Sequence, residues 1–343
     1  MNISYGLRYM VALLPGVLAV AGGLTDPVFH VFNIIWNLIV LVLLDWILPP
    51  RHDNPPANQW AVIPNAILYL ASALHLAAIV LLIVRASQHD YTFNQLMQAT
   101  ASVGLNAGIS GIVVAHELIH RKNAVERLLG QLNMFVVNYT HFYVEHVRGH
   151  HRTVGTAADP ATARLGESFY AFVVRTVPGQ WYSALQLEAE RLKKMKRSVY
   201  GLRNYVVRAG LLQLAVCVAL GWWLGLTALA AYLGMSFVAV FQLEYVNYIE
   251  HYGLMREPGR KVEAQHSWQS DAPGSRLTLI ELSRHADHHM KASKPYHTLV
   301  THEGGPELHS GYFGMFFIVL IPPLWFRMVH SRMKQAGVYP AQA

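Results

Sequence analysis

Apolar stretches of membrane-spanning length alternate with short polar breaks in the first part of this chain, and they return after residue 205. A bilayer core about 30 Å thick needs roughly 20 apolar residues per helical span. Six stretches approach or reach that length with few or no charges, and most of the breaks between them are rich in glycine or proline. We therefore expect six transmembrane helices, over residues 9–24, 28–48, 60–84, 93–115, 206–224 and 226–248.

The last apolar segment, residues 312–329, carries Pro322 and Pro323 near its middle. Proline interrupts the hydrogen bonding of a helix, so the segment is shorter than its composition implies. We expect it to lie at the membrane interface or to be partly inserted. The pattern thus predicts an all-α, polytopic membrane protein with one membrane-embedded domain over residues 1–343. The polar segments 116–205 and 249–343 should form its cytoplasmic cap.

Composition and charge agree with this architecture. Of the 343 residues, 53% are hydrophobic and 14% are charged, which is too apolar for an ordinary soluble domain. The first apolar run lacks a strongly basic flank and a clear cleavage site, so we expect a span there and not a signal peptide. Cys217 is the only cysteine, which excludes a disulfide framework and a thiolate metal centre within this chain.

The positive charges orient the predicted bundle. With a cytoplasmic N-terminus, essentially every Lys and Arg except Arg85 falls on the cytoplasmic side, as the positive-inside rule requires. The formal charge of +7 therefore calls for no nucleic-acid partner. The basic run from Arg191 to Arg203 suits anionic membrane lipid, or an acidic protein partner.

Nine of the 19 histidines fall into four short clusters. Residues four apart share one face of a helix, so two imidazoles at that spacing can reach one metal ion. All four clusters lie at the predicted cytoplasmic ends of spans four and six or in the polar segments that follow, so the topology lets them converge. The clusters are His116 and His120; His146, His150 and His151; His251; and His285, His288 and His289.

Nine imidazoles in one place imply two metal ions with open positions, because a single ion seldom takes more than about six ligands. Nitrogen donors suit iron, zinc or copper, and the spacing does not choose among them. Carboxylates beside such ligands typically accept the second ring N–H and fix the tautomer. We assign that role to the acidic residues next to the clusters, namely Glu117, Glu145, Asp159, Glu250 and Asp287.

Two other classes of protein fit parts of this pattern. His116 to His120 matches the H-E-x-x-H signature of zinc proteases, but a protease leaves most of the clustered histidines unused. A metal transporter should hold its pathway residues near the bilayer midplane, where only His75 lies. His141 is close enough to His146 to support the site but is not expected to be a ligand, and His266 and His309 are treated in the same way. The other single histidines are expected to be structural or exposed, namely His30, His52, His75, His89, His297, His302 and His330.

With these clusters in view, the chain resembles the integral-membrane alkane 1-monooxygenases, which are non-haem di-iron hydroxylases related to xylene methyl hydroxylase and to membrane fatty acid desaturases. The strings NYIEHYGL and HSW favour an alkane hydroxylase over a desaturase. Ser283, Ala286 and His309 depart from the usual family pattern without removing a ligand. The matching segments are residues 44–46, 54–56, 116–122, 145–152, 159–164, 247–254, 266–268 and 284–289.

The resemblance implies two iron ions held by the nine clustered histidines, and hydroxylation of terminal methyl groups with O₂ to give primary alcohols. It also implies electrons from a separate rubredoxin and its reductase, a bacterial inner-membrane location, and a lipid-dissolved hydrocarbon as substrate. Methyl hydroxylation of alkyl-aromatics and fatty acid desaturation are the alternative activities of this superfamily. Trp36 is our candidate for the large residue that would cap an alkane channel.

Overall fold

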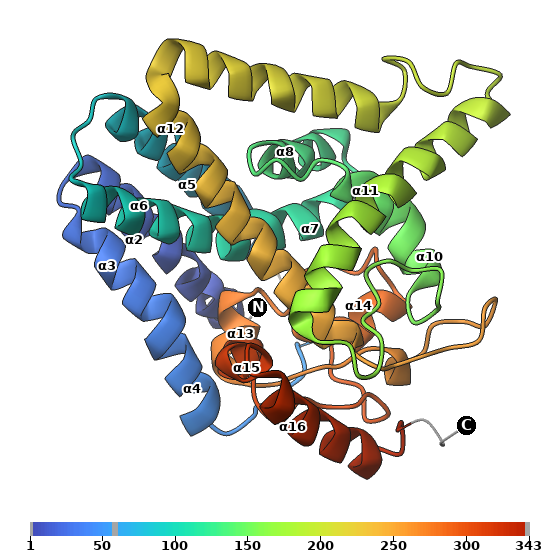
Figure 1. The fold of residues 1–343 in the computed structure, drawn as a ribbon. Coiled ribbons are helices and arrows are strands. Elements are labelled where there is room, and N and C mark those ends of the chain that lie inside the picture. Colours follow the sequence, from blue (N-terminus) through green and yellow to red (C-terminus); the bar gives the residue numbers. More distant parts are fainter. Residues whose placement is uncertain (1–2, 57–60, 340–343) are drawn as a thin grey trace.

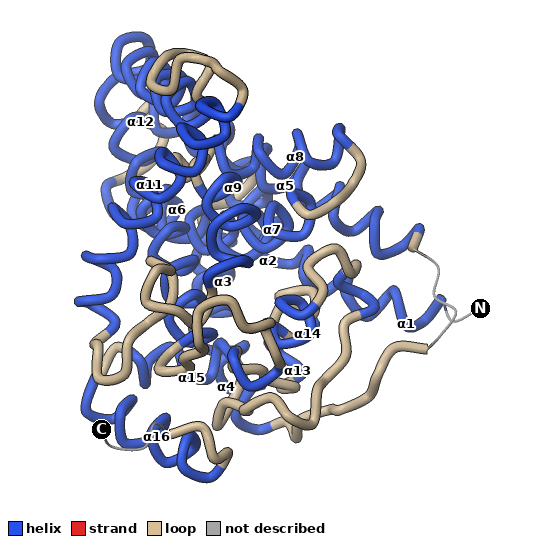
Figure 2. The backbone as a smooth tube through the Cα atoms, turned by 90° about the vertical axis from the view of Figure 1, so that its right-hand side faces the viewer, coloured by secondary structure: helices blue, strands red, loops and turns tan. Residues whose placement is uncertain are grey.

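The computed structural model describes residues 3–56 and 61–339, and within these ranges the protein consists of helices and loops without a β-strand (Figures 1 and 2). The predicted all-α class is therefore confirmed. Five segments of the described chain are helices long and apolar enough to cross a membrane, which are Tyr5–Leu24, Val28–Ile47, Val62–Ser87, Phe93–Ile119 and Tyr205–His251.

The N-terminal half of the bundle follows the predicted spans closely. Asp26 and Pro27 lie in the break between the first two, where Asp26 Oδ1 accepts a hydrogen bond from the main chain of Val28. Thr92 and Gln95 form a capping box at the start of the fourth. The elements are α1 (Ile3–Leu7), η1 (Arg8–Leu13), α2 (Leu14–Leu24), α3 (Val28–Ile35), η2 (Trp36–Val40), α4 (Leu41–Ile47), α5 (Val62–Ser87), α6 (Phe93–Asn106), η3 (Ala107–Ile112) and α7 (Val113–Ile119).

Several boundaries differ from the prediction by one to four residues; the first helical segment begins at Tyr5, for example, and the third ends at Ser87. Trp60, where the third span was expected to begin, lies outside the described residues, and α5 begins at Val62. The fourth helical segment continues four residues beyond the predicted end at residue 115, and its last element, α7, includes His116 and Glu117. The first histidine cluster therefore lies at the end of the helix by which the chain leaves the bundle.

The residues predicted as spans five and six form the two halves of one element, α12 (Tyr205–His251), which turns sharply at Gly225 (Figure 1). Gly225 has φ 85° and ψ 164°, a conformation that glycine adopts without a Cβ clash. Trp222 and Trp223 are largely exposed beside the turn, as is common for tryptophan at a membrane interface. The glycine turn is where the sequence predicts it, while the six-span count stays a prediction.

The remaining helices form a cap around the ends of α7 and α12. Residues 312–329 are divided at Pro322, and neither half is counted among the candidate spans. Figure 2 shows loops gathered around α13 and α14 on this side of the bundle. The elements are α8 (Ala124–Phe135), α9 (Phe142–Glu145), η4 (His146–His150), α10 (His151–Thr153), α11 (Phe169–Lys194), η5 (Ala264–His266), α13 (Pro273–Thr278), α14 (His285–Met290), η6 (Tyr296–Thr298), α15 (Tyr312–Val319) and α16 (Pro322–Gln335).

Asp45, at the end of the second predicted span, ties the cap to the bundle. Its carboxylate accepts hydrogen bonds from the main chain of Ser275 at 2.9 Å and the hydroxyl of Ser275 at 2.6 Å. It also accepts from the main-chain nitrogens of Phe313 and Gly314 at 3.1 and 3.3 Å. A buried carboxylate is tolerated only with such partners. One side chain of the bundle therefore positions both α13 and α15.

Candidate metal centre

The nine clustered histidines meet at one place between α7, η4, α10, α14 and the end of α12. They divide into two groups, and within each group the ligand nitrogens lie within 4.8 Å of one another. The first group contains five residues, His116, His120, His146, His151 and His288. The second contains four residues, His150, His251, His285 and His289.

The ring nitrogens of these residues face one another at short distances. His289 Nε2 lies 2.8 Å from His285 Nε2 and 3.3 Å from His150 Nε2. His151 Nε2 lies 3.0 Å from His146 Nε2. The Nε2 atoms of His116 and His120 are buried without a hydrogen-bond partner in the described structure.

This arrangement fits metal ions better than a hydrogen-bonded histidine cluster. A neutral imidazole has one N–H and one lone pair, so several Nε2 atoms that converge cannot all find donors among themselves. A cation between them would accept the lone pairs together. The donor set is entirely nitrogen, which suits iron, zinc or copper.

The division into two groups does not follow the i, i+4 spacing alone. His146 and His150 are four apart, yet they belong to different groups, and His151 joins His146. The reason is that residues 146–150 form a π-helical turn, in which each hydrogen bond spans five residues. The wider turn brings positions five apart to the same side.

Burial keeps six of the clustered imidazoles in the cap neutral. Burial, together with the neighbouring imidazoles, holds the pKa of five of them well below the usual value: His146, His151, His285, His288 and His289. Burial also lowers the pKa of His120 to about 4. A histidine must be neutral to bind a metal, so these side chains are in their ligating form at neutral pH.

Of the five carboxylates expected beside the ligands, Asp159 makes the predicted contact. It lies 2.9 Å from His150 Nδ1 and also accepts hydrogen bonds from Thr162 Oγ1 at 2.6 Å and the Ala161 main chain at 3.1 Å. Burial acts in the opposite direction, but the His150 imidazole and Thr162 hold the pKa of Asp159 below its usual value. An acceptor at Nδ1 leaves the Nε2 lone pair facing the centre.

The other four carboxylates lie differently. Glu250 Oε2 is 3.1 Å from His285 Nε2, the nitrogen that faces the centre and not the outer one. Glu145 is buried with both oxygens unpartnered in the described structure, and burial followed by repulsion from Asp159 raises its pKa well above the usual value. Glu117 pairs with Arg121, and Asp287 pairs with Lys294 and His302. Neither carboxylate makes the contact with a clustered imidazole that the sequence predicted.

The remaining histidines lie outside both groups. His141 stacks edge-on against Tyr139, His309 lies beside Trp46, and His266 Nδ1 accepts a hydrogen bond from the main chain of Glu263. His302, which no spacing pattern selects, lies with its Nε2 atom 2.9 Å from Asp287 Oδ1. No pattern in the sequence links these two residues, because a loop brings them together.

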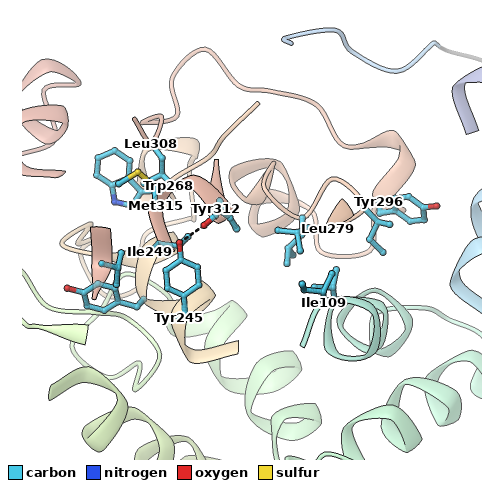
Figure 3. Close-up of a cluster of buried hydrophobic side chains, with 14 of the residues drawn as sticks. Ile109, Tyr245, Ile249, Trp268, Leu279, Tyr296, Leu308, Tyr312 and Met315 are labelled. Carbon is cyan, nitrogen blue, oxygen red and sulfur yellow. Dashed lines mark hydrogen bonds between the residues drawn. The ribbon is translucent and has the colours of Figure 1, made fainter. Parts of the chain in front are cut away.

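A mostly apolar cavity extends from the centre into the helical bundle. His116, His146, His285 and Glu250 line it at the metal end. Leu105, Gly108 and Gln242 line it deeper in the bundle. Figure 3 shows part of its walls, with Ile109 and Leu279 on one side and Tyr245 and Tyr312 on the other.

Phe142 and three residues of the second predicted span define the walls of the cavity near the centre and deeper in the bundle. Phe142 stacks on the His146 ring at 4.6 Å between centroids and lines the cavity beside it. From the second span, Asn37, Leu38 and Val42 face the cavity. Trp36, our candidate cap, is not among the lining residues, since the π-helical turn η2 presents Asn37 instead.

A membrane-embedded helical bundle with a histidine-rich metal site at its end defines a class of membrane enzymes, and the fatty acid desaturase family model matches residues 94–309. The match covers both histidine groups. Within that class, the chain belongs to the alkane 1-monooxygenase family.

That membership rests on curated relatives. The chain is 36% identical over 314 residues to alkane 1-monooxygenase 1 of Alcanivorax borkumensis, a match that covers 85% of this chain and 76% of the relative. It is 42% identical over 238 residues to alkane 1-monooxygenase 1 of Pseudomonas aeruginosa, covering 68% of this chain and 62% of that relative's length. The xylene/toluene monooxygenase hydroxylase component of Pseudomonas putida is 28% identical over 296 residues, covering 84% and 78%.

Proposed function

We propose that this protein hydroxylates terminal methyl groups of alkanes to primary alcohols with O₂ and two external electrons. The observation that carries the proposal is the junction of nine imidazoles with an apolar cavity inside the bundle. An alkane offers no charge or polar group for acid–base catalysis, so its C–H bond demands a redox metal. The cavity supplies the shape and the dryness that such a substrate requires.

We assign one iron ion to each histidine group, so that five imidazoles would hold one ion and four the other. Iron bound there supplies the activation of O₂ for attack on an unactivated C–H bond. The chain's own residues do the rest: Asp159 orients His150, and the cavity walls aim the methyl end of the substrate toward His116 and His285. Apolar walls also keep bulk water from the reacting carbon.

The electron donor is proposed to be a separate rubredoxin, reduced by its own reductase, at the cytoplasmic face of a bacterial inner membrane. His120 and His151 are the clustered histidines with partial exposure, and both belong to the five-residue group. Arg148, within η4, pairs with Glu188 at 2.7 Å, and Arg191 pairs with the same carboxylate. These pairs join the basic C-terminal part of α11 to the turn that carries His146 and His150, which supports the docking of an acidic donor on this side of the protein.

The test uses membranes that contain the protein, rubredoxin, reductase and NADH, supplied with octane and xylene together. We expect 1-octanol as the main product, and His251→Ala or His288→Ala to lose bound iron and alcohol formation. His89→Asn is the matched control, because His89 is exposed, lies outside both groups and has a positive φ that asparagine tolerates.

Other products would point to another member of the superfamily. Methylbenzyl alcohol in place of octanol would favour the aromatic alternative, and an alkene would favour a desaturase. Octanol formation that persists in both histidine variants would refute the assignment of the centre.

A further inference from the structure

A chain of hydrogen-bonded polar side chains crosses the interior of the bundle and ends at the cavity. His30 Nδ1 lies 3.2 Å from Ser102 Oγ, and Asn33 donates through Nδ2 to the carbonyl oxygen and the hydroxyl of Ser102, at 3.1 and 2.9 Å. Asn37 donates through Nδ2 to the carbonyl oxygen and Oδ1 of Asn33, at 2.8 and 2.9 Å. Polar side chains inside a span are costly and mark candidate functional positions.

The acceptors determine how both amides are oriented. The carbonyl oxygen of Ser102 can only accept, so Asn33 presents Nδ2 to it and Oδ1 to Asn37. Asn37 must then present Nδ2 to Asn33, which uses both of its N–H groups. Asn37 Oδ1 is left without a donor in the described structure, although the side chain is 2% exposed. An unpaired buried acceptor destabilises the protein until a donor reaches it.

Asn37 lines the cavity, so the missing donor can come from a molecule bound there. Gln242, the neighbouring amide of the cavity wall, uses its two N–H groups on the carbonyl oxygens of Gly104 and Val238, at 3.0 and 3.2 Å. Leu38 and Leu105 beside Asn37 have no donor to offer. The wall is therefore mostly apolar here, and Asn37 Oδ1 is the amide oxygen of the lining that is fully buried without a donor in the described structure.

The position of Asn37 sets a length for such a molecule. Asn33 on one helix contacts Ser102 on another. Asn37 lies one turn after Asn33, Leu105 lies one turn after Ser102, and both line the cavity, so Leu105 marks the depth of Asn37. Leu105 lies eleven residues before His116 on the same helical segment, which at 1.5 Å per residue is about 16 Å. An extended chain advances roughly 1.2 Å per bond, so the span corresponds to roughly 10 to 13 bonds.

We propose that Asn37 is a specificity-determining residue that accepts a hydrogen bond from the hydroxyl group of a medium-chain primary alcohol whose methyl end lies at the metal centre. This inference rests on the proposed function and names a substrate class for the same site. An alkane of equal length fills the cavity but leaves Asn37 Oδ1 unpaired. The alcohol satisfies it, and the product is a diol with a hydroxyl group at each end.

The reaction balances with the components already named. One terminal C–H bond breaks and one C–O bond forms, so the methyl carbon loses two electrons. One oxygen atom of O₂ enters the new hydroxyl, and the other leaves as water with two protons and the two electrons from the external donor. The hydroxyl group at Asn37 takes no part in the chemistry, and Asn37 acts only in binding and positioning.

The test compares 1-undecanol with dodecane, because the two chains have the same number of heavy atoms. In the wild type, kcat/KM for diol formation from 1-undecanol is expected to exceed kcat/KM for dodecane hydroxylation. Asn37→Leu, which keeps the volume and removes the acceptor, should lower the ratio of the two values about three- to tenfold. Asn37→Asp should restore the ratio, because a buried protonated carboxyl still accepts through one oxygen and donates to Asn33 through the other.

A second arm uses binding alone and needs no turnover. In metal-free protein, 1-undecanol should raise the melting temperature of the wild type and of Asn37→Asp more than that of Asn37→Leu, whereas dodecane should affect all three equally. An unchanged kcat/KM ratio together with equal melting shifts would overturn the role of Asn37. If the wild type oxidises neither chain while the melting shifts differ as expected, the proposed function fails and the role of Asn37 in binding stands.

Discussion

Replacing Asp159 by asparagine should impair one half of the metal centre selectively. Asp159 accepts three hydrogen bonds, from His150, Thr162 and Ala161, and asparagine cannot accept all three. If its oxygen faces His150, its NH₂ group meets the main-chain N–H of Ala161. If its NH₂ group faces His150, the imidazole must carry its proton on Nε2, where the metal should bind.

The expected magnitude follows from the tautomer. Loss of a carboxylate behind a metal-bound histidine typically lowers metal affinity about 10- to 100-fold, which is about 1.4–2.8 kcal/mol. His150 belongs to the four-residue group, so that group should weaken while the five-residue group keeps its affinity. The predicted difference between the two groups follows from the contact of Asp159 with His150.

The assay is an anaerobic titration of the metal-free protein with Co²⁺ in the presence of a competing chelator. The wild type should bind two ions, and Asp159→Asn should bind one with wild-type affinity and one weakly. Asp90→Asn is the control, since Asp90 is an exposed partner of Arg85 outside the centre. Two ions bound with unchanged affinity would refute the orienting role of Asp159, and equal weakening of both would refute the division into two groups.

Three further predictions test other parts of the structure. Asp45→Asn should destabilise the fold by about 1–3 kcal/mol, because in either orientation its NH₂ group would face a main-chain N–H, that of Ser275 in α13 or those of Phe313 and Gly314 in α15. Thermal melting beside Asp26→Asn should show the loss, and equal melting temperatures would contradict it. Leu105→Phe should fill the deep part of the cavity and shift the alcohols formed from mixed alkanes toward shorter chains. Leu128→Phe, at an exposed position, should leave the product profile unchanged. Acidification from pH 7.5 to 5.5 should lower the melting temperature of the metal-free protein. Burial lowers the pKa of His120 to about 4 in the folded state, so below about pH 6.5 the unfolded chain binds a proton that the folded chain does not. A constant melting temperature would contradict this.

The sequence predicted the bundle well because hydropathy is a local property. Each apolar stretch carries its own signal, and Gly225 marks its own turn. Helix α11 escaped notice, because it is amphipathic, largely polar and contains Pro178, so it resembles neither a span nor an uninterrupted helix. Its position depends on contacts such as Glu188 with Arg148, which join residues 40 positions apart. Signals of that kind are absent from any single stretch of sequence.

The site was predictable in membership and less so in arrangement. Histidine spacing selected all nine residues that the structure brings together, but it gave no means of dividing them. The π-helical turn at residues 146–150 decides that His151 and not His150 joins His146. The carboxylates were chosen by adjacency along the chain, and adjacency failed for Glu117 and Asp287, whose side chains turn toward Arg121 and Lys294.

Three π-helical turns surround the centre and its cavity, and each sits where a regular helix would present the wrong residue. The turn at residues 146–150 separates two ligands, while η2 turns Asn37 toward the cavity and η3 places Gly108, Ile109 and Ile112 along its wall. A π turn adds one residue to a helix and so shifts the face that follows it. Upstream of η3 the helix packs on Asn33 through Ser102, and downstream it must present His116 and His120 to the metal. The inserted residues thus let a single segment satisfy the bundle at one end and the chemistry at the other, which explains why irregular turns are concentrated here.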